Sequence, residues 1–237
     1  MNYLRKFLLL AKIGLQNPAE LIDRLEAIFT SRLERYLGRE IDYNPMDSRR
    51  ALSTVIQWLE GSIDANETKD IEDEVRTRMQ ALEEIAPFTT KHHGDFSLAH
   101  VCFTACRLLK PEIVVETVVA YGVTTAFILK ALQLNNKGTL HSIDLPPLGK
   151  NADLYVGYLV PEYLRDRWVL HRGASKRVLL SLLEKLRHVD VFVHDSLHTY
   201  WNIKRELLLV TPHLSRPSVV IADDIHGNKA FLEMVRR

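Results

Sequence analysis

Glycine is scarce in this sequence, with 10 among 237 residues, whereas an average usage of about 7% would give roughly 17. Long apolar runs are absent as well, and no stretch approaches the roughly 18 consecutive apolar residues that a membrane-spanning helix needs. We therefore expect no integral membrane association. The apolar fraction of 46% and the charged fraction of 26% exclude a largely disordered protein, a collagen-like fibre and a disulfide-stapled miniprotein.

Cysteine is also rare, because Cys102 and Cys106 are the only two. Four residues apart, they share one face of a helix, which is poor geometry for a disulfide. We expect two buried free thiols in a reducing compartment. Near the N-terminus the apolar run Phe7–Leu10 is short and no small-residue cleavage site follows it. The expected location is cytoplasmic.

Neither sign of charge dominates, since 31 Lys and Arg residues stand against 30 Asp and Glu residues. The balance shifts along the chain: residues 41–90 hold 5 basic and 11 acidic residues, and residues 91–237 hold 19 basic and 14 acidic residues. Neither segment has the dense basic stripe of a nucleic-acid-binding surface, so no nucleic-acid partner is expected. Two mildly charged surfaces that face each other are the plainer interpretation.

The first 90 residues have helical patterns and no strand pattern. Asn17-Pro18-Ala19-Glu20 is typical of a helix start, and Gly38 suits the C-cap of the same helix. Between them apolar residues recur at helical spacing, at Leu21, Leu25, Ile28, Leu33 and Leu37. Two more helices are expected, one after Asp47 and one from about Asn66 to Ile85. We expect a helical extension over residues 1–90 that covers the active site or joins copies of the chain into a homo-oligomer.

The pattern changes after residue 90. A helix is expected from a cap at Asp95 to Lys110, and from there short β-branched runs alternate with helical segments. The expected strands are 113–116, 139–144, 168–171, 189–193 and 219–222, and the expected helices are 124–134, 175–186 and 199–213. Strands that alternate with helices favour βαβ units and a parallel sheet. We therefore predict an α/β fold over residues 91–237, with a doubly wound, mostly parallel sheet.

Carboxylates stand where four of these five strands end. Glu116 and Asp144 follow the first two strands, and Asp144 lies 22 residues after Gly122, a spacing that suits hydrogen bonds to ribose hydroxyls. Asp195, Asp223 and Asp224 follow the later strands. Because ligands bind beyond the carboxyl ends of such strands, we expect these groups to converge on one site.

Three carboxylates at neighbouring strand tips repel each other unless a cation lies among them. Hard oxygen ligands of this kind favour magnesium, calcium or manganese. His198 follows Asp195 by three residues and should lie one turn into the next helix, where it is well placed as a general base. A histidine bonded to backbone at a helix start is the simpler alternative.

Several of these segments resemble the class I S-adenosylmethionine-dependent methyltransferases. The segment from Val115-Glu116-Thr117 to Tyr121-Gly122-Val123-Thr124 looks like their first motif, and Leu140–Pro146 looks like their second strand. His194–Tyr200 and Ala222–Ile225 are similar to the metal-dependent branch, which includes macrocin-type sugar O-methyltransferases and cephalosporin-hydroxylase-like proteins. The resemblance covers about residues 90–237.

The resemblance implies a Rossmann-like methyltransferase fold and a role for each matching residue. Glu116, Thr117 and Gly122 would contact the methionine part of S-adenosylmethionine, and Asp144 would bind its ribose. Further cofactor contacts are implied at Ala174, Ser175 and Asp195. Magnesium would lie among Asp195, Asp223 and Asp224, where it would lower the pKa of an acceptor hydroxyl. His198 would remove the proton, so that a small-molecule acceptor is methylated on oxygen.

The missing glycines fall at informative places. The family has glycines along the loop after the first strand, but Val118 and Ala120 stand at two of these positions here, and a β-branched side chain disfavours a positive φ. Ser215–Ser218 stands where a glycine turn is usual, and the family's closing antiparallel strands have no room before Arg237. A methyltransferase-fold protein that has lost catalysis and serves in binding or assembly is therefore the alternative. A nicotinamide-dependent oxidoreductase would need a G-x-G-x-x-G fingerprint, which the sequence lacks.

Overall fold

A computed structural model of the chain describes residues 3–37, 43, 47–83, 85–87, 96–149 and 151–236. Five strands form one sheet in the order β3-β2-β1-β4-β5, and every neighbouring pair is parallel. The strands are β1 (Ile113–Thr117), β2 (Thr139–Asp144), β3 (Trp168–Arg172), β4 (Val189–His194) and β5 (Leu214–Ala222). The predicted α/β fold with a parallel, Rossmann-like sheet is confirmed.

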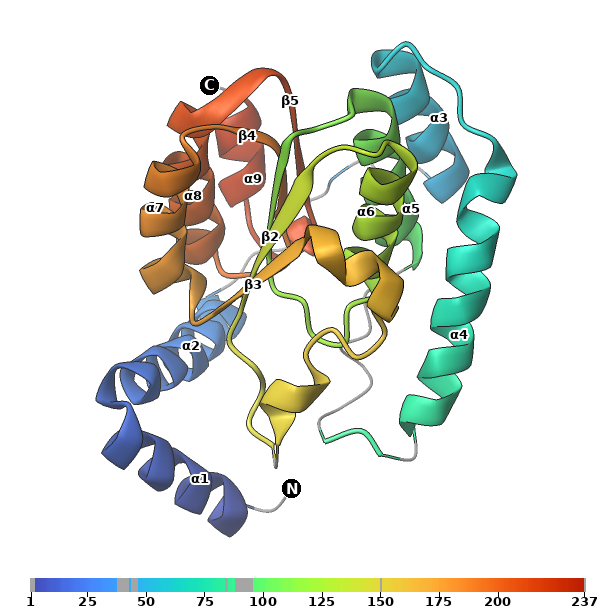
Figure 1. Ribbon diagram of the computed structural model, residues 1–237. Coiled ribbons are helices and arrows are strands. Elements are labelled where there is room, and N and C mark those ends of the chain that lie inside the picture. The colour runs from blue at the N-terminus through green and yellow to red at the C-terminus, as the bar shows by residue number, and fades with distance from the viewer. Residues whose placement is uncertain are drawn as a thin grey trace.

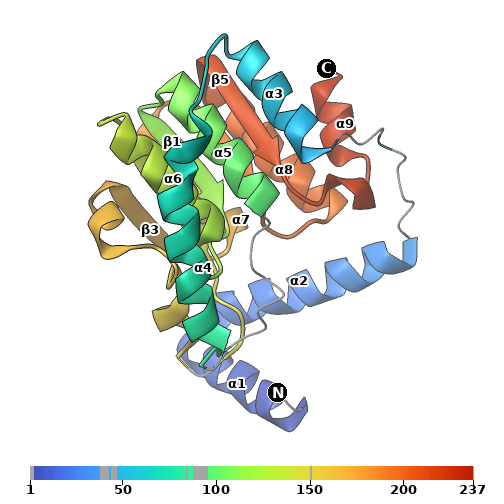
Figure 2. The same ribbon diagram turned by 90° about the vertical axis from the view of Figure 1, so that its right-hand side faces the viewer.

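Helices cover both faces of the sheet (Figures 1 and 2). On one face lie α4 (Lys69–Glu83), α5 (Phe96–Leu109) and α6 (Val123–Leu134), and on the other lie α7 (Ser175–Leu186), α8 (Tyr200–Val210) and α9 (Ala230–Val235). Successive strand residues point to opposite faces, so Val114 packs in the first core and Val115 in the second. This double burial explains why consecutive residues of the central strands, such as Val114 and Val115, are both apolar.

The helical front consists of α1 (Tyr3–Gln16), α2 (Pro18–Leu37) and α3 (Ser48–Trp58), followed by η1 (Ala65–Thr68) and α4. The start of α2 is as predicted, because the Asn17 side chain accepts the backbone N–H of Glu20 at 3.1 Å. The predicted caps at Gly38 and Asp95 lie outside the described residues. None of the helices in the described ranges is long and apolar enough to cross a membrane.

The spacing of apolar residues in α2 suggested that its apolar face packs on the body, but the structure places its acidic face there. Leu25, Ile28 and Leu33 are exposed, whereas Glu20 and Asp23 are only 7% and 5% exposed. The periodicity correctly grouped the apolar side chains on one face, but it could not tell which face is covered. Lys176 and Arg177 at the start of α7 hold the acidic face against the body, because they form ion pairs with Asp23.

Two smaller expectations also need correction. Strand β5 begins at Leu214 rather than 219, with an interruption of its register against β4 between Val189 and Val191. Residues 215–218, which were expected to precede this strand, are thus an irregular stretch of an edge strand, where proline is tolerated. Helix α8 ends at Val210 and a 3₁₀ turn, η5 (Thr211–His213), completes the segment that was expected to be one helix. Cys102 and Cys106 are buried free thiols, as predicted.

Candidate active site

A pocket of about 440 Å³ lies at the carboxyl edge of the sheet, where ligands of parallel α/β proteins bind. Its volume suits a small molecule. The loops after β1 to β4 contribute Val118, Leu145, Gly173, Ala174, Ser196 and Leu197, and the start of α7 contributes Ser175 and Lys176. Helices α2 and α8 contribute Asp23, Glu26, Ala27, Thr30, Trp201, Asn202 and Arg205. Of the residues expected to bind a cofactor, Ala174 and Ser175 line this pocket.

The loop after β1 has a glycine-type conformation without the glycines. Val118 has φ +87°, Ala120 has φ +49° and Gly122 has φ +94°. Residues other than glycine rarely adopt these left-handed backbone angles. The Val118 side chain lines the pocket. The sequence prediction that Val118 is the significant departure in this loop agrees with its backbone conformation.

Asp144 holds this loop in place. Its Oδ2 accepts the backbone N–H groups of Val119 and Ala120 at 2.8 and 2.9 Å. Burial raises the pKa of Asp144, and these two hydrogen bonds oppose that rise. Its Oδ1 is buried and accepts no hydrogen bond from the described residues. A free buried acceptor at the tip of β2 is the kind of group that a ribose hydroxyl would satisfy.

Glu116, Thr117 and Gly122, which were also expected to contact the cofactor, do not line the pocket and instead make contacts within the protein around the tip of β1. Glu116 Oε1 accepts the hydroxyls of Ser142 and Thr125 at 2.6 and 2.7 Å, and burial raises its pKa to about 7. Thr117 is buried as well. A side chain on Gly122 would place its Cβ 2.9 Å from the Cα of Gly157, so this glycine is needed for close packing.

The predicted metal and base residues do gather at the tips of β4 and β5. His198 lies with Nε2 3.7 Å from Asp195 Oδ1 and with Nδ1 3.5 Å from Asp224 Oδ2. Asp195 also makes a carboxyl–carboxyl hydrogen bond to Asp223. His198 precedes α8 in a loop instead of lying one turn into the helix, which corrects the expected position but keeps the expected proximity.

Burial and like charges control the protonation of this cluster. Burial, the Asp223 carboxylate and Glu116 raise the pKa of Asp195 to about 8. Burial and the neighbouring His194 lower the pKa of His198. A neutral imidazole at neutral pH can accept a proton, which is what a general base requires.

The cluster has the oxygen-rich chemistry that divalent cations prefer. Two carboxyl groups in contact share a proton unless a cation replaces it. Within the described ranges, however, no three acidic, histidine or cysteine side chains are close enough together to hold one metal ion. The metal site stays a prediction.

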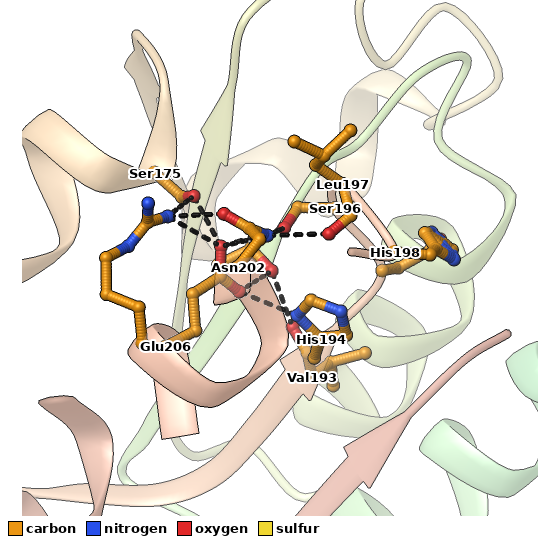
Figure 3. Close-up of polar contacts among 11 residues, drawn as sticks. Ser175, Val193, His194, Ser196, Leu197, His198, Asn202 and Glu206 are labelled. Carbon is orange, nitrogen blue, oxygen red and sulfur yellow. Dashed lines mark hydrogen bonds and ion pairs between the residues drawn. The ribbon is translucent and has the colours of Figure 1, made fainter. Parts of the chain in front are cut away.

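Sequence reasoning missed Glu206, which organises the floor of the site (Figure 3). This fully buried carboxylate accepts a hydrogen bond from His194 Nδ1 at 2.7 Å. It also accepts hydrogen bonds from the hydroxyls of Thr117 and Ser196, at 2.9 and 2.7 Å. Burial alone would raise the pKa of Glu206, but the hydrogen bonds from His194 and the serines outweigh it and lower the pKa. The network ties the tips of β1 and β4 to α8, and it fixes the loop that carries Asp195 and His198.

A signal for Glu206 exists in the sequence. It lies among apolar residues on the inward face of a predicted helix, followed by Leu207. A charged residue on such a face is rarely buried without partners. Because those partners come from distant segments, the sequence could not name them.

Comparisons with known proteins agree with the fold. Residues 115–225 match the family of methyltransferase domains. No curated protein matches the sequence. Solved structures with a similar fold include the O-methyltransferase TomG from Streptomyces achromogenes, at 14% identity over 81% of this chain and 85% of that chain with a TM-score of 0.53. An O-methyltransferase from Bacillus cereus is similar at 11% identity over 78% and 82% with a TM-score of 0.51.

A methyltransferase from Geobacter sulfurreducens is a third such structure, at 17% identity over 81% of this chain and 88% of that chain with a TM-score of 0.50. The TomG structure holds SAM, and the Bacillus cereus structure holds SAH. At these identities the likeness concerns the fold alone, so the assignment of individual residues rests on the geometry of the site.

Proposed function

We propose that this protein is a class I S-adenosylmethionine-dependent enzyme that methylates a hydroxyl group of a small molecule, because residues 115–225 match the methyltransferase-domain family. The observation that carries the proposal is the pocket at the carboxyl edge of the sheet, with the His198 cluster at the tips of β4 and β5 beside it. A nucleoside-sized space and a base at neighbouring strand tips are what methyl transfer to oxygen requires.

The pocket residues fit the nucleoside end of the cofactor. Leu145, Ala174 and Leu197 offer apolar walls, which suit a flat adenine ring. Asp144 lies between Ile143 and Leu145, which line the pocket, and is not itself a lining residue. Its Oδ1 is a buried acceptor without a partner among the described residues, and we assign it to a ribose hydroxyl. When bound, S-adenosylmethionine supplies the activated methyl group.

The protein's own contribution to the chemistry is a positioned base. His198 accepts the proton of the acceptor hydroxyl on one ring nitrogen, because burial keeps the imidazole neutral before reaction by lowering its pKa. Asp195 and Asp224 flank the ring on its two nitrogens. The negative charge of Asp224 stabilises the imidazolium that forms. Glu206 fixes His194 and Ser196 on either side of Asp195, which holds the loop of the base.

We also propose that a divalent cation such as Mg²⁺ binds between Asp195 and the Asp223–Asp224 pair. The chemistry of these oxygen donors supports this, but the spacing of the described residues does not gather three ligands around one point. No step of the mechanism above therefore depends on a metal. Turnover measured in Mg²⁺ and in excess chelator tests this part of the proposal separately, and equal rates would contradict it.

A second candidate function follows from one specific feature. The left-handed Val118 puts a branched side chain into the pocket, where the family resemblance implies glycine. A protein that keeps the fold for binding or assembly would show this loss of cofactor space. Calorimetric titration with S-adenosylmethionine separates the two, because the catalytic proposal requires binding and millimolar cofactor without heat would contradict it.

The outer face of the α1–α2 hairpin supports a homo-oligomer. Phe7, Leu8, Leu15, Leu25 and Phe29 are exposed there, and exposed apolar faces of this kind usually mark an interaction surface. We propose that copies of the chain pair through this face. A cytoplasmic location is proposed on the basis of the two free thiols.

A further inference from the structure

Helix α2 forms one side of the pocket with a single face. Asp23, Glu26, Ala27 and Thr30 all line it, and their spacing of three, four and seven residues places them on one side of a helix. The opposite wall comes from the loops after β2 and β3 and from the start of α7. A ligand in this pocket is thus enclosed between the sheet edge and a helix from the other end of the chain, as Figures 1 and 2 show for the course of α2.

Ion pairs attach α2 to the body. Asp23 lies 2.9 Å from Lys176 Nζ and 2.5 Å from Arg177 Nε. One turn earlier, Glu20 lies 2.7 Å from Arg172 Nη1. Near the other end of the helix, Glu34 accepts the backbone N–H of Tyr200 at the start of α8. The anchor points therefore lie on both sides of the pocket.

Apolar packing contributes little to this attachment. The two hydrophobic cores of the described structure include no residue of α2, and Ile22, Leu25 and Phe29 point away from the body and are exposed. A helix held mainly by charge can separate from the body at a smaller cost than a helix packed into a core. The same contacts are available again when it returns.

We infer that α2 is the closing wall of the nucleoside subsite, and that Asp23 is a positioning residue that holds this wall against Lys176 and Arg177 over a bound ligand. The inference rests on the proposed function, since it takes the pocket as the cofactor site. Binding of the nucleoside and docking of α2 then favour each other. A variant that docks α2 less often loses affinity in proportion to the docked fraction.

Binding of S-adenosylhomocysteine, measured by calorimetry, tests the inference with paired variants of the full chain. Ala27→Phe fills the pocket from α2 and leaves the ion pairs in place, so we expect at least a tenfold loss of affinity. Ile22→Phe introduces the same side chain at an exposed position of the same helix and should bind as the unchanged protein does. Asp23→Asn should weaken binding about tenfold. Its control is Glu67→Gln, which breaks the remote ion pair with Arg107 and should have no effect.

Hydrogen exchange of the α2 amides provides the readout that a general loss of stability would not reproduce. We expect the ligand to slow exchange across residues 21–34, and Asp23→Asn to speed exchange there without speeding it in β1 or β4. If the ligand binds the unchanged protein and Ala27→Phe equally, and α2 gains no protection, the inference is wrong while the proposed function stands. If the ligand binds neither the unchanged protein nor any variant, the proposed function fails and the inference fails with it.

Discussion

Val118→Gly offers a direct view of the loop that sets this chain apart. Val118 has φ +87°, and a branched residue in a sparsely populated backbone region costs about 1–3 kcal/mol. Glycine adopts this conformation without strain but gives up about 0.5–1 kcal/mol of chain entropy on folding. The side chain is half-buried, so its loss removes part of its hydrophobic contribution too. We expect a net gain of about 1 kcal/mol, or a rise of about 2–4 °C in Tm for a chain of this size.

Val119→Gly is the matched control, because it makes the same chemical change one residue along. Val119 is 6% exposed and is not among the described residues with positive φ. Its replacement removes buried surface without relieving strain, and should lower stability by about 2–4 kcal/mol. Thermal and urea unfolding measure both variants. Equal losses of stability in the two variants would refute the reasoning about the backbone of this loop.

The same substitution should also change the pocket. Since the Val118 side chain lines the cavity, its removal opens space beside the tips of β1 and β2. We expect S-adenosylmethionine to bind Val118→Gly more tightly than it binds the unchanged protein, by calorimetric titration. Unchanged affinity would mean that the side chain does not obstruct the cofactor.

The remaining predictions concern the buried carboxylates and the helical front. Asp144→Ala leaves two loop N–H groups without an acceptor and should cost about 2–4 kcal/mol in urea unfolding, whereas a loss below 0.5 kcal/mol would contradict the assigned contacts. Glu206→Ala should cost about 3–5 kcal/mol because it strands several buried donors, and Glu206→Gln should cost less. Ion pairs outweigh burial and lower the pKa values of Glu20 and Asp23 in the folded protein. The stability that these ion pairs contribute is therefore present above the pKa values of the unfolded chain, near pH 4, and is lost as the pH falls through the lowered pKa values of the folded protein. The Tm difference between the unchanged protein and Asp23→Asn should therefore vanish in acid, and a constant difference would count against the pairs. Phe29→Lys should shift the sedimentation coefficient toward that of the monomer, if copies pair through the hairpin.

Much of the fold could be predicted from the sequence because its signals are local. Asn17 and Asp47 cap helices where their side chains and positions suggested. The β-branched runs became the five strands, and their alternation with helices required a parallel sheet. The start of β5 was missed because proline and serine resemble a turn, while an edge strand tolerates them.

The site was predictable only where topology brings residues together. Asp195 and Asp223 end adjacent strands of a parallel sheet, so their proximity follows from strand order. The anchor of α2 does not follow, because Asp23 and Lys176 are far apart in the sequence and either face of the helix could have been covered. Asp144 was predicted to face ribose, yet one of its two oxygens serves the loop.

Calorimetric titration of the protein with S-adenosylhomocysteine, with Ala27→Phe as the blocked-pocket control, tests the central claim most directly. The account predicts saturable binding to the unchanged protein and at least tenfold weaker binding to the variant. The absence of heat at millimolar ligand for the unchanged protein would contradict it, and would leave a methyltransferase fold without a working cofactor site.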